Sequence, residues 1–130
     1  MKISKKRFVT EWIKDLRSGK FRKTTKRLYN DGCYCALGVA CKTGERLGIP
    51  DAAFVKPSPL GSEYTYTSNF RSQTRKDYTP GEWFEDIMGE GDPVLKTDSD
   101  KVSVSELNDN FGYSFKEIAD CLEHTFLKRK

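Results

Sequence analysis

The chain has 130 residues and a mass of 14.9 kDa, which is the size of one domain and excludes a multidomain machine. Leu, Ile, Val and Phe make up 28 residues, enough for one hydrophobic core, so full disorder is not expected. The formal net charge of +4 conceals an asymmetry, because residues 1–30 carry a net +9 and residues 81–125 a net −9. These charges either neutralise each other in the fold or leave a basic face for an acidic partner.

The sequence predicts neither a membrane span nor an export signal. Its longest apolar stretch, around residues 33–41, is far shorter than the roughly 20 residues that cross a bilayer. Residues 1–7 lack the apolar segment of a signal peptide. We therefore expect a single cytoplasmic domain over residues 1–130 without a membrane partner. In that reducing compartment the four cysteines are expected to be free thiols without a catalytic role.

A helix is predicted over residues 5–18. Apolar residues recur there at intervals of three and four, which places them on one helical face: Phe8, Val9, Trp12, Ile13 and Leu16. Gly19 follows and can adopt the left-handed conformation that ends a helix.

A β-hairpin is predicted over residues 20–35. Aromatic and β-branched residues favour extended structure in this segment. Asn30, Asp31 and Gly32 are the residue types of a tight turn, since they tolerate a positive φ.

The middle of the chain is less regular. Residues 36–41 are small and apolar, and residues 45–47 continue them at helical spacing, which favours a short buried helix. Residues 51–78 are irregular apart from a strand-like run at 63–67. Residues 79–89 carry a capping box and an apolar stripe, which are typical of a helix. The alternation in residues 101–105 predicts a short strand.

The strongest helix signal lies in residues 115–128. Ser114 and Glu117 can form a capping box. Apolar residues then recur at helical spacing: Phe115, Ile118, Ala119, Leu122 and Phe126.

These elements predict an α+β fold in one small domain. The apolar stripes of helices 5–18 and 115–128 need an apolar partner, and the strands are too few and too short to be stable alone. We therefore expect both helices to pack on a short antiparallel sheet that includes the hairpin in the N-terminal half of the chain.

No catalytic or metal-binding constellation stands out. Cys33, Cys35 and Cys41 lie close together in sequence, but the one histidine, His124, is near only Cys121, one helical turn away. The sequence has no Cys-x-x-Cys or His-x-x-x-His spacing, and buried free cysteines are common in protein cores. We expect no cofactor and no metal, and a binding protein is favoured over an enzyme.

The candidate binding surface is the basic hairpin. Residues 20–29 interleave basic and aromatic side chains, a composition that suits nucleic acid as well as a protein interface. In a two-stranded ribbon, however, successive side chains alternate, so the charges divide between two faces. The candidate residues are Arg22, Lys23, Lys26, Arg27, Tyr29 and Tyr34. Asn108 and Asp109 are a secondary pair, although an Asx turn leading into the last helix explains them as well.

Three segments together carry a resemblance: residues 12–21, which include Leu-Arg-Ser-Gly-Lys-Phe at 16–21, the run Tyr-Cys-Ala-Leu-Gly-Val-Ala-Cys at residues 34–41, and Leu107-Asn108-Asp109 continuing to Phe-Lys-Glu-Ile-Ala-Asp at residues 115–120. In this pattern the chain resembles small uncharacterised proteins of tailed bacteriophages and prophages. The middle motif of that family often reads Tyr-Cys-Cys-Leu-Gly-Val-Leu-Cys, so Ala36 and Ala40 depart from it. The loss of the paired cysteine weakens any thiol-pair or metal role. The resemblance leaves residues 50–80 unmatched.

The resemblance implies a phage context and brings no assigned activity. Taken with the residues, it leads us to expect an accessory protein that binds a host macromolecule, a defence or regulatory protein, without catalysis. Two alternatives stay open: a nucleic-acid-binding protein that uses the basic hairpin, and a small nucleotide-binding protein or hydrolase with a pocket of convergent polar groups. The oligomeric state is not predicted.

Overall fold

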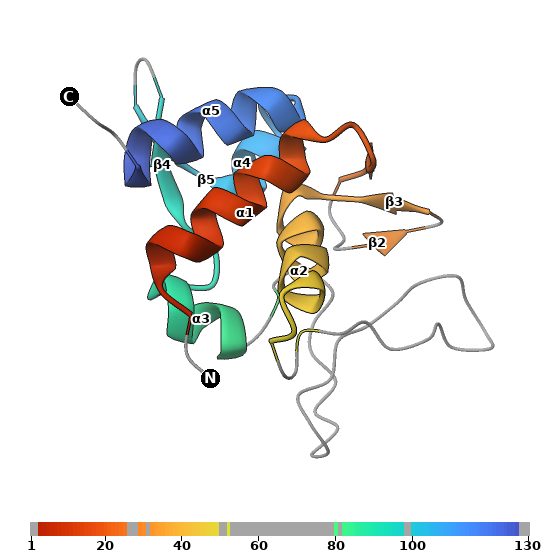
Figure 1. Cartoon of the computed structure of the whole chain (residues 1–130). Coiled ribbons are helices and arrows are strands. Elements are labelled where there is room, and N and C mark those ends of the chain that lie inside the picture. The colour runs from red at the N-terminus through yellow and green to blue at the C-terminus, as the bar shows by residue number, and fades with distance from the viewer. Residues whose placement is uncertain are drawn as a thin grey trace.

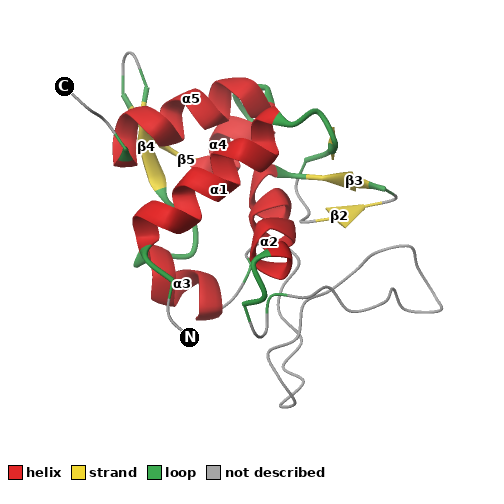
Figure 2. Ribbon diagram, in the orientation of Figure 1, coloured by secondary structure: helices red, strands yellow, loops and turns green. Residues whose placement is uncertain are grey.

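The computed structural model describes residues 3–25, 29–30, 32–49, 52, 80, 82–97 and 100–127. Within these ranges the fold is α+β, as predicted, with five helices and two small sheets (Figures 1 and 2). The elements in chain order are α1 Lys5–Arg17, β1 Arg22–Lys23, β2 Tyr29–Asn30, β3 Cys33–Tyr34, α2 Ala36–Arg46, α3 Glu82–Met88, β4 Val94–Lys96, β5 Lys101–Ser103, α4 Val104–Asp109 and α5 Phe115–Phe126.

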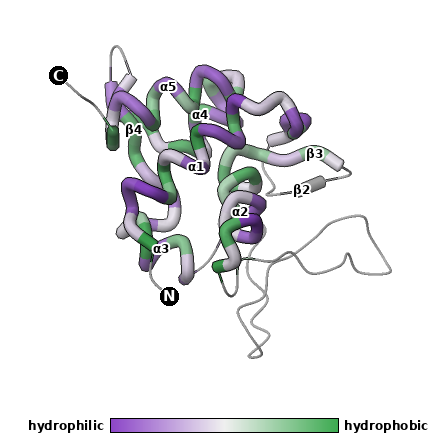
Figure 3. The backbone as a smooth tube through the Cα atoms, in the orientation of Figure 1, coloured by the Kyte–Doolittle hydropathy of each residue, from purple (hydrophilic) through white to green (hydrophobic). Residues whose placement is uncertain are grey.

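The helix α1 is the centre of the fold. It lies along α5 on one side and against α2 and α3 on the other (Figure 1). Lys5 at its start lies over the ring of Phe126, while Arg17 at its end reaches Asp120 and Glu123, so α1 and α5 run antiparallel. Both helices are amphipathic, with hydrophobic and hydrophilic residues alternating along the tube in Figure 3. The two helices therefore bury much of their apolar stripe against each other.

An aromatic cluster fills the core between α1 and α3. Phe8, Trp12 and Phe84 are fully buried, and Trp83 is nearly so. Their rings meet mostly edge to face, with centroids 5.6–6.0 Å apart. Such pairs add to the stability that buried aromatic area already provides.

The N-terminal sheet differs from the prediction. Its strand order is β1-β3-β2, in which β1 pairs with β3 in parallel, Arg22 opposite Cys33 and Lys23 opposite Tyr34. Only β2 runs antiparallel to β3. The antiparallel hairpin predicted over residues 20–35 is therefore wrong for β1, which joins the far edge of β3 and is no hairpin arm.

A long-range contact explains this arrangement. The end of β1 is fixed by two hydrogen bonds: the Thr24 N–H donates to the Tyr34 carbonyl, and the Asn108 side chain donates to the Thr24 carbonyl at 2.9 Å. Asn108 is 84 residues away along the chain. Local turn chemistry could not predict such a partner.

The C-terminal sheet pairs β4 with β5 antiparallel, Leu95 opposite Val102. The strand predicted at 101–105 ends at Ser103, whose hydroxyl accepts from the Glu106 N–H and begins α4. β4 and α4 were not predicted. α5 packs beside β4 and is joined to it where the Lys96 N–H donates to the Thr125 hydroxyl. Both helices were predicted to pack on a sheet that includes the N-terminal hairpin; instead α5 packs on the β4–β5 sheet, and α1 packs mainly on α5 and α2.

One of the two predicted helix starts can be compared with the structure. The capping box at α5 is confirmed, because Ser114 Oγ accepts from the Glu117 N–H and Glu117 Oε1 accepts from the Ser114 N–H. The capping residue predicted for α3, Thr79, lies outside the described residues, as do the run at 63–67 and Lys128–Lys130. In the part of the chain that is described, no helix is long and apolar enough to cross a membrane.

Candidate binding surface

The exposed cations at the end of α1 and along the edge strand β1 form a positive edge that we call the basic face: Lys20, Arg22 and Lys23. As consecutive strand residues, Arg22 and Lys23 point to the two sides of this edge. Gly19, at φ +80°, ends α1 in the left-handed conformation and turns the chain into β1. All three side chains are exposed, and β1 is an edge strand of its sheet. Arg22 and Lys23 are two of the binding residues predicted from the sequence. Lys20 precedes Arg22 by two positions in the chain.

Among the described residues, the cations of the basic face lack ion pairs, as do other exposed cations such as Lys6 and Arg7. Lys20, Arg22 and Lys23 form no salt bridge with any residue that the structure describes. Arg17 and Arg46, in contrast, each bind two carboxylates. The opposite charges of the two ends of the chain thus neutralise each other in part and leave this face positive.

Arg17 is the residue that joins the basic end of the chain to the acidic end. Its Nη2 lies 2.9 Å from Glu123 Oε1 and 2.7 Å from Asp120 Oδ1. The hydrogen bonds that this guanidinium donates, first to Glu123 and then to Asp120, raise its pKa. Arg17 therefore stabilises the contact between α1 and α5.

The aromatic side chains beside the basic face are packed. Phe21 and Tyr34 are both half-buried, and their rings meet edge to face with centroids 5.2 Å apart. Each ring is thus partly covered by the core and by the other ring. This geometry suits a rigid support for β1 better than a platform for stacked bases.

Asn108 is a buried anchor of this surface. Its side chain is 1 % exposed; Oδ1 accepts from the Ala36 N–H at 3.1 Å, and Nδ2 donates to the Thr24 carbonyl and to Asp109 Oδ1. It therefore connects α4 to the end of β1 and to the start of α2. Asp109, half-buried, accepts from Asn108. These bonds give both residues a supporting role behind the basic face.

The structure places only part of the predicted set. Lys26 and Arg27 lie outside the described residues, and Tyr29 is described as backbone alone. Tyr34 and Asn108 are brought together with β1, since both bond to Thr24.

An open cleft lies beside the basic face, between the C-terminal half of α1 and the end of α2. It has a volume of about 270 Å³ and is lined by Asp15, Lys20, Phe21, Lys42, Glu45 and Arg46. Lys20 belongs to both the cleft and the basic face. Phe21, which also lines the cleft, lies between Lys20 and Arg22 in the chain. Sequence reasoning missed the cleft, because its two walls are joined only in the folded chain.

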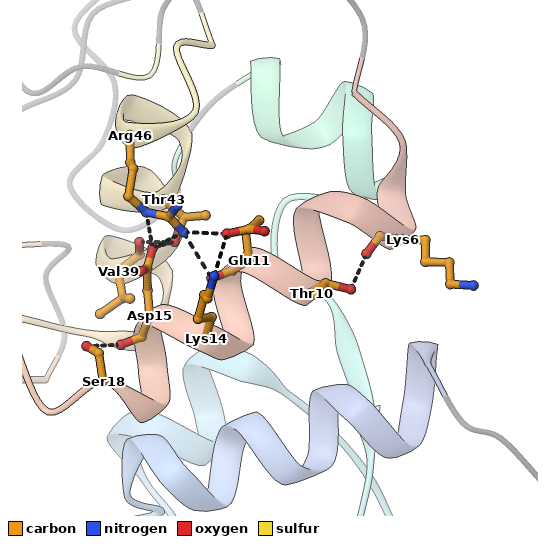
Figure 4. A network of polar contacts seen from close by, with 9 residues as sticks. All are labelled: Lys6, Thr10, Glu11, Lys14, Asp15, Ser18, Val39, Thr43 and Arg46. Carbon is orange, nitrogen blue, oxygen red and sulfur yellow. Dashed lines mark hydrogen bonds and ion pairs between the residues drawn. The ribbon is translucent and has the colours of Figure 1, made fainter.

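A polar network closes one wall of this cleft (Figure 4). Arg46 Nη2 lies 2.9 Å from Glu11 Oε1 and 3.1 Å from Asp15 Oδ2, and the buried Thr43 hydroxyl donates to the same Asp15 oxygen at 2.7 Å. The hydrogen bond from Arg46 lowers the pKa of the Glu11 carboxyl. The network ties α1 to α2 and fixes Arg46 at the cleft.

A second hollow, of about 440 Å³, lies between the β4–β5 sheet and α5. Its lining residues are Lys96, Thr97, Tyr113, Glu117, Asp120, Cys121 and His124. Two of its carboxylates already serve the fold, Glu117 in the capping box and Asp120 in the ion pair with Arg17. Among the described residues no group of three or more His, Cys, Asp or Glu side chains could hold a metal ion.

All four cysteines are free thiols in the structure. Cys35 and Cys41 are buried, whereas Cys33 and Cys121 are half-buried. Burial raises the pKa of the Cys35 thiol to about 12 and raises that of Cys41 as well. Both thiols are therefore protonated at neutral pH, which disfavours nucleophilic chemistry at these positions.

No protein-family model, curated protein or solved structure matches this chain.

Proposed function

We propose that this chain is a non-enzymatic binding protein that contacts an acidic surface of a protein partner through its basic face. The observation that carries the proposal is the cluster of Lys20, Arg22 and Lys23, exposed within four residues and unpaired among the described residues. Unpaired surface cations raise the rate of encounter with an acidic partner and favour it over a basic one.

Two features favour a protein over a nucleic acid as the partner. The rings of Phe21 and Tyr34 are half-buried against each other, which leaves little ring face for base stacking. The adjoining cleft also mixes carboxylates, Asp15 and Glu45, with its cations. A continuous phosphate backbone is repelled by such carboxylates, whereas a protein surface offers charges of both signs.

The resemblance to small bacteriophage proteins directs the search for the partner to bacterial host proteins, within a phage-encoded accessory role in the host cytoplasm. A nucleic-acid partner is the main rival and is an outcome of the test below.

The test is a capture experiment with a charge-reversed basic face. The triple variant Lys20→Glu, Arg22→Glu, Lys23→Glu is compared with the wild type and with a matched control, in which Lys6, Lys96 and Lys101 are changed to Glu. Each is immobilised and exposed to nuclease-treated bacterial lysate. We expect the wild type and the control to retain the same protein and the basic-face variant to lose it.

Retention that is equal in all three proteins would contradict the proposed surface. Capture that nuclease abolishes, with affinity that falls steeply as salt rises, would replace the protein partner with nucleic acid.

A further inference from the structure

The residues that line the cleft beside the basic face include three cations, Lys20, Lys42 and Arg46, and two carboxylates, Asp15 and Glu45. Lys42 Nζ is 2.8 Å from Glu45 Oε1, and Arg46 is held by Glu11 and Asp15, so these cations have carboxylates of their own. Lys20, the remaining cation of the lining, has none among the described residues. Lys20 is therefore the lining cation that can pair with an anionic group entering the cleft.

Arg46 also keeps hydrogen-bond donors for such a group. Its bonds to Glu11 and Asp15 use Nε and Nη2 alone. The two N–H groups of Nη1 have no acceptor in the part of the chain that the structure describes, and the side chain is 43 % exposed. Because Glu11 and Asp15 fix the guanidinium, these donors are oriented before any ligand arrives, which lowers the entropic cost of binding.

The size and polarity of the cleft limit what it can hold. At about 270 Å³ it is smaller than the pockets that bind small-molecule ligands, which start at roughly 300 Å³. The ring of Phe21 provides an apolar wall, and the carboxylates of Asp15 and Glu45 repel a dianion more strongly than a monoanion. A single carboxylate on a short methylene stem fits these conditions better than a phosphate.

We infer that this cleft receives one glutamate side chain of the acidic protein partner, with its carboxylate between the Lys20 ammonium and Nη1 of Arg46 and its stem against Phe21. This inference rests on the proposed function and makes it more specific. The basic face attracts the partner, and the cleft binds one acidic side chain of it.

The probe for this inference is hexaglutamate, titrated into ¹⁵N-labelled protein at constant ionic strength. We expect saturable shifts of the amide signals of Lys20 and Phe21 and of the Arg46 Nε–H signal. Lys20→Gln weakens the binding about three- to ten-fold, as expected for one charge-assisted contact at a partly exposed site. The control Lys101→Gln, which removes the same charge from β5, leaves the affinity unchanged.

Inorganic phosphate is titrated in parallel. Phosphate that saturates the same signals as tightly as hexaglutamate would overturn the choice of a carboxylate. Absence of saturable shifts at these three groups would overturn the cleft as a site. An unchanged affinity in Lys20→Gln, together with a loss in Arg22→Gln/Lys23→Gln, would overturn the cleft while leaving the basic-face proposal in place.

Discussion

Asn108 shows how one buried side chain supports the surface proposed to bind. It satisfies the Ala36 N–H at the start of α2 and the Thr24 carbonyl at the end of β1, and it is fully enclosed. A buried amide with both ends occupied is a conformational constraint, since its removal leaves two backbone groups without partners. Asn108 therefore acts on binding through the position of β1.

We expect Asn108→Ala to lower the free energy of unfolding by about 2 to 3 kcal/mol, because two backbone groups lose their partners away from water. Urea denaturation followed by tryptophan fluorescence measures the change. Asn110→Ala, at an exposed residue two positions on, is the control and should shift stability by less than about 0.5 kcal/mol. Equal effects at the two positions would show that the buried bonds do not matter.

The four thiols should separate into two reactivity classes. At pH 8 a thiol of pKa about 12 is ionised to only about one part in ten thousand, so Cys35 should resist alkylation, and Cys41, buried alike, should resist it too. The half-buried Cys33 and Cys121 should react first. Timed iodoacetamide labelling with peptide mass spectrometry reads each site, and unfolded protein, in which all four react, is the reference. Native labelling of Cys35 at the rate of Cys33 would disprove the assignment.

At the scale of the elements, α2 is fitted against α3 and residue 52. Gly44 lies in the interior of α2, where alanine would ordinarily stabilise the helix by roughly 0.5–1 kcal/mol. A Cβ at this position, however, would meet the Trp83 ring at 2.8 Å and the Ala52 methyl at 2.9 Å. The close approach explains why the least helix-prone ordinary residue stands here.

Gly44→Ala should therefore destabilise the protein by about 1 to 3 kcal/mol, the range for overpacked cores, in place of the usual gain. Thermal unfolding of the single variant and of the double variant Gly44→Ala/Trp83→Leu gives the check, with Trp83→Leu alone as reference. Because Leu at position 83 is smaller than Trp, Gly44→Ala should destabilise the Trp83→Leu background less than it destabilises the wild type. A stabilising effect of Gly44→Ala in the wild-type background would contradict the packing.

The contact between α1 and α2 should depend on pH through Glu11. The pKa of this carboxyl is lowered below 4.5 mainly by the hydrogen bond from Arg46. Its contribution to stability is therefore present above the unfolded pKa and is lost as the pH falls through the folded pKa. Glu11→Gln should lower the free energy of unfolding by up to about 1 kcal/mol at pH 7. It should have no effect at a pH low enough to protonate Glu11 in both the folded and the unfolded state. Urea midpoints between pH 7 and 3 measure this, with Glu90→Gln as control; a difference that persists at low pH would contradict the mechanism.

The sequence predicted the elements that local signals encode. The apolar period of α1 and the capping box of α5 were both found as expected, since each depends on residues within one or two turns. β1 could not be assigned correctly, because its place beside β3 depends on Asn108, far along the chain. β4, whose one buried residue is Leu95, carries too short a pattern to be recognised.

The candidate surface was predicted in the same uneven way. Exposure of Arg22 and Lys23 follows from charge alone and was expected from their sequence. The absence of ion pairs at these residues, and the cleft that Lys20 shares with Arg46, depend on which carboxylates the fold brings near. Composition gives the total charge of a segment, whereas only packing decides which charges remain available.

At the scale of the whole molecule, folding pairs some of the opposite charges and leaves others unpaired among the described residues. The end of α1 is neutralised by α5 through Arg17, and the acids of α1 are neutralised by Arg46 of α2. The basic face is left positive beside these pairs, on an edge strand supported from behind by buried contacts. A small domain with an exposed positive edge is suited to recognising an acidic partner.

Site-specific photocrosslinking tests this account most directly. A photoreactive residue is placed at position 22 or, as a control, at position 101 on β5, and the protein is irradiated in bacterial lysate with and without nuclease. We predict a discrete protein adduct from position 22 that nuclease does not remove, that is lost when Lys20 and Lys23 are changed to Glu, and that position 101 does not give. Adducts that contain nucleic acid, or protein adducts that form equally from both positions, would contradict the central claim.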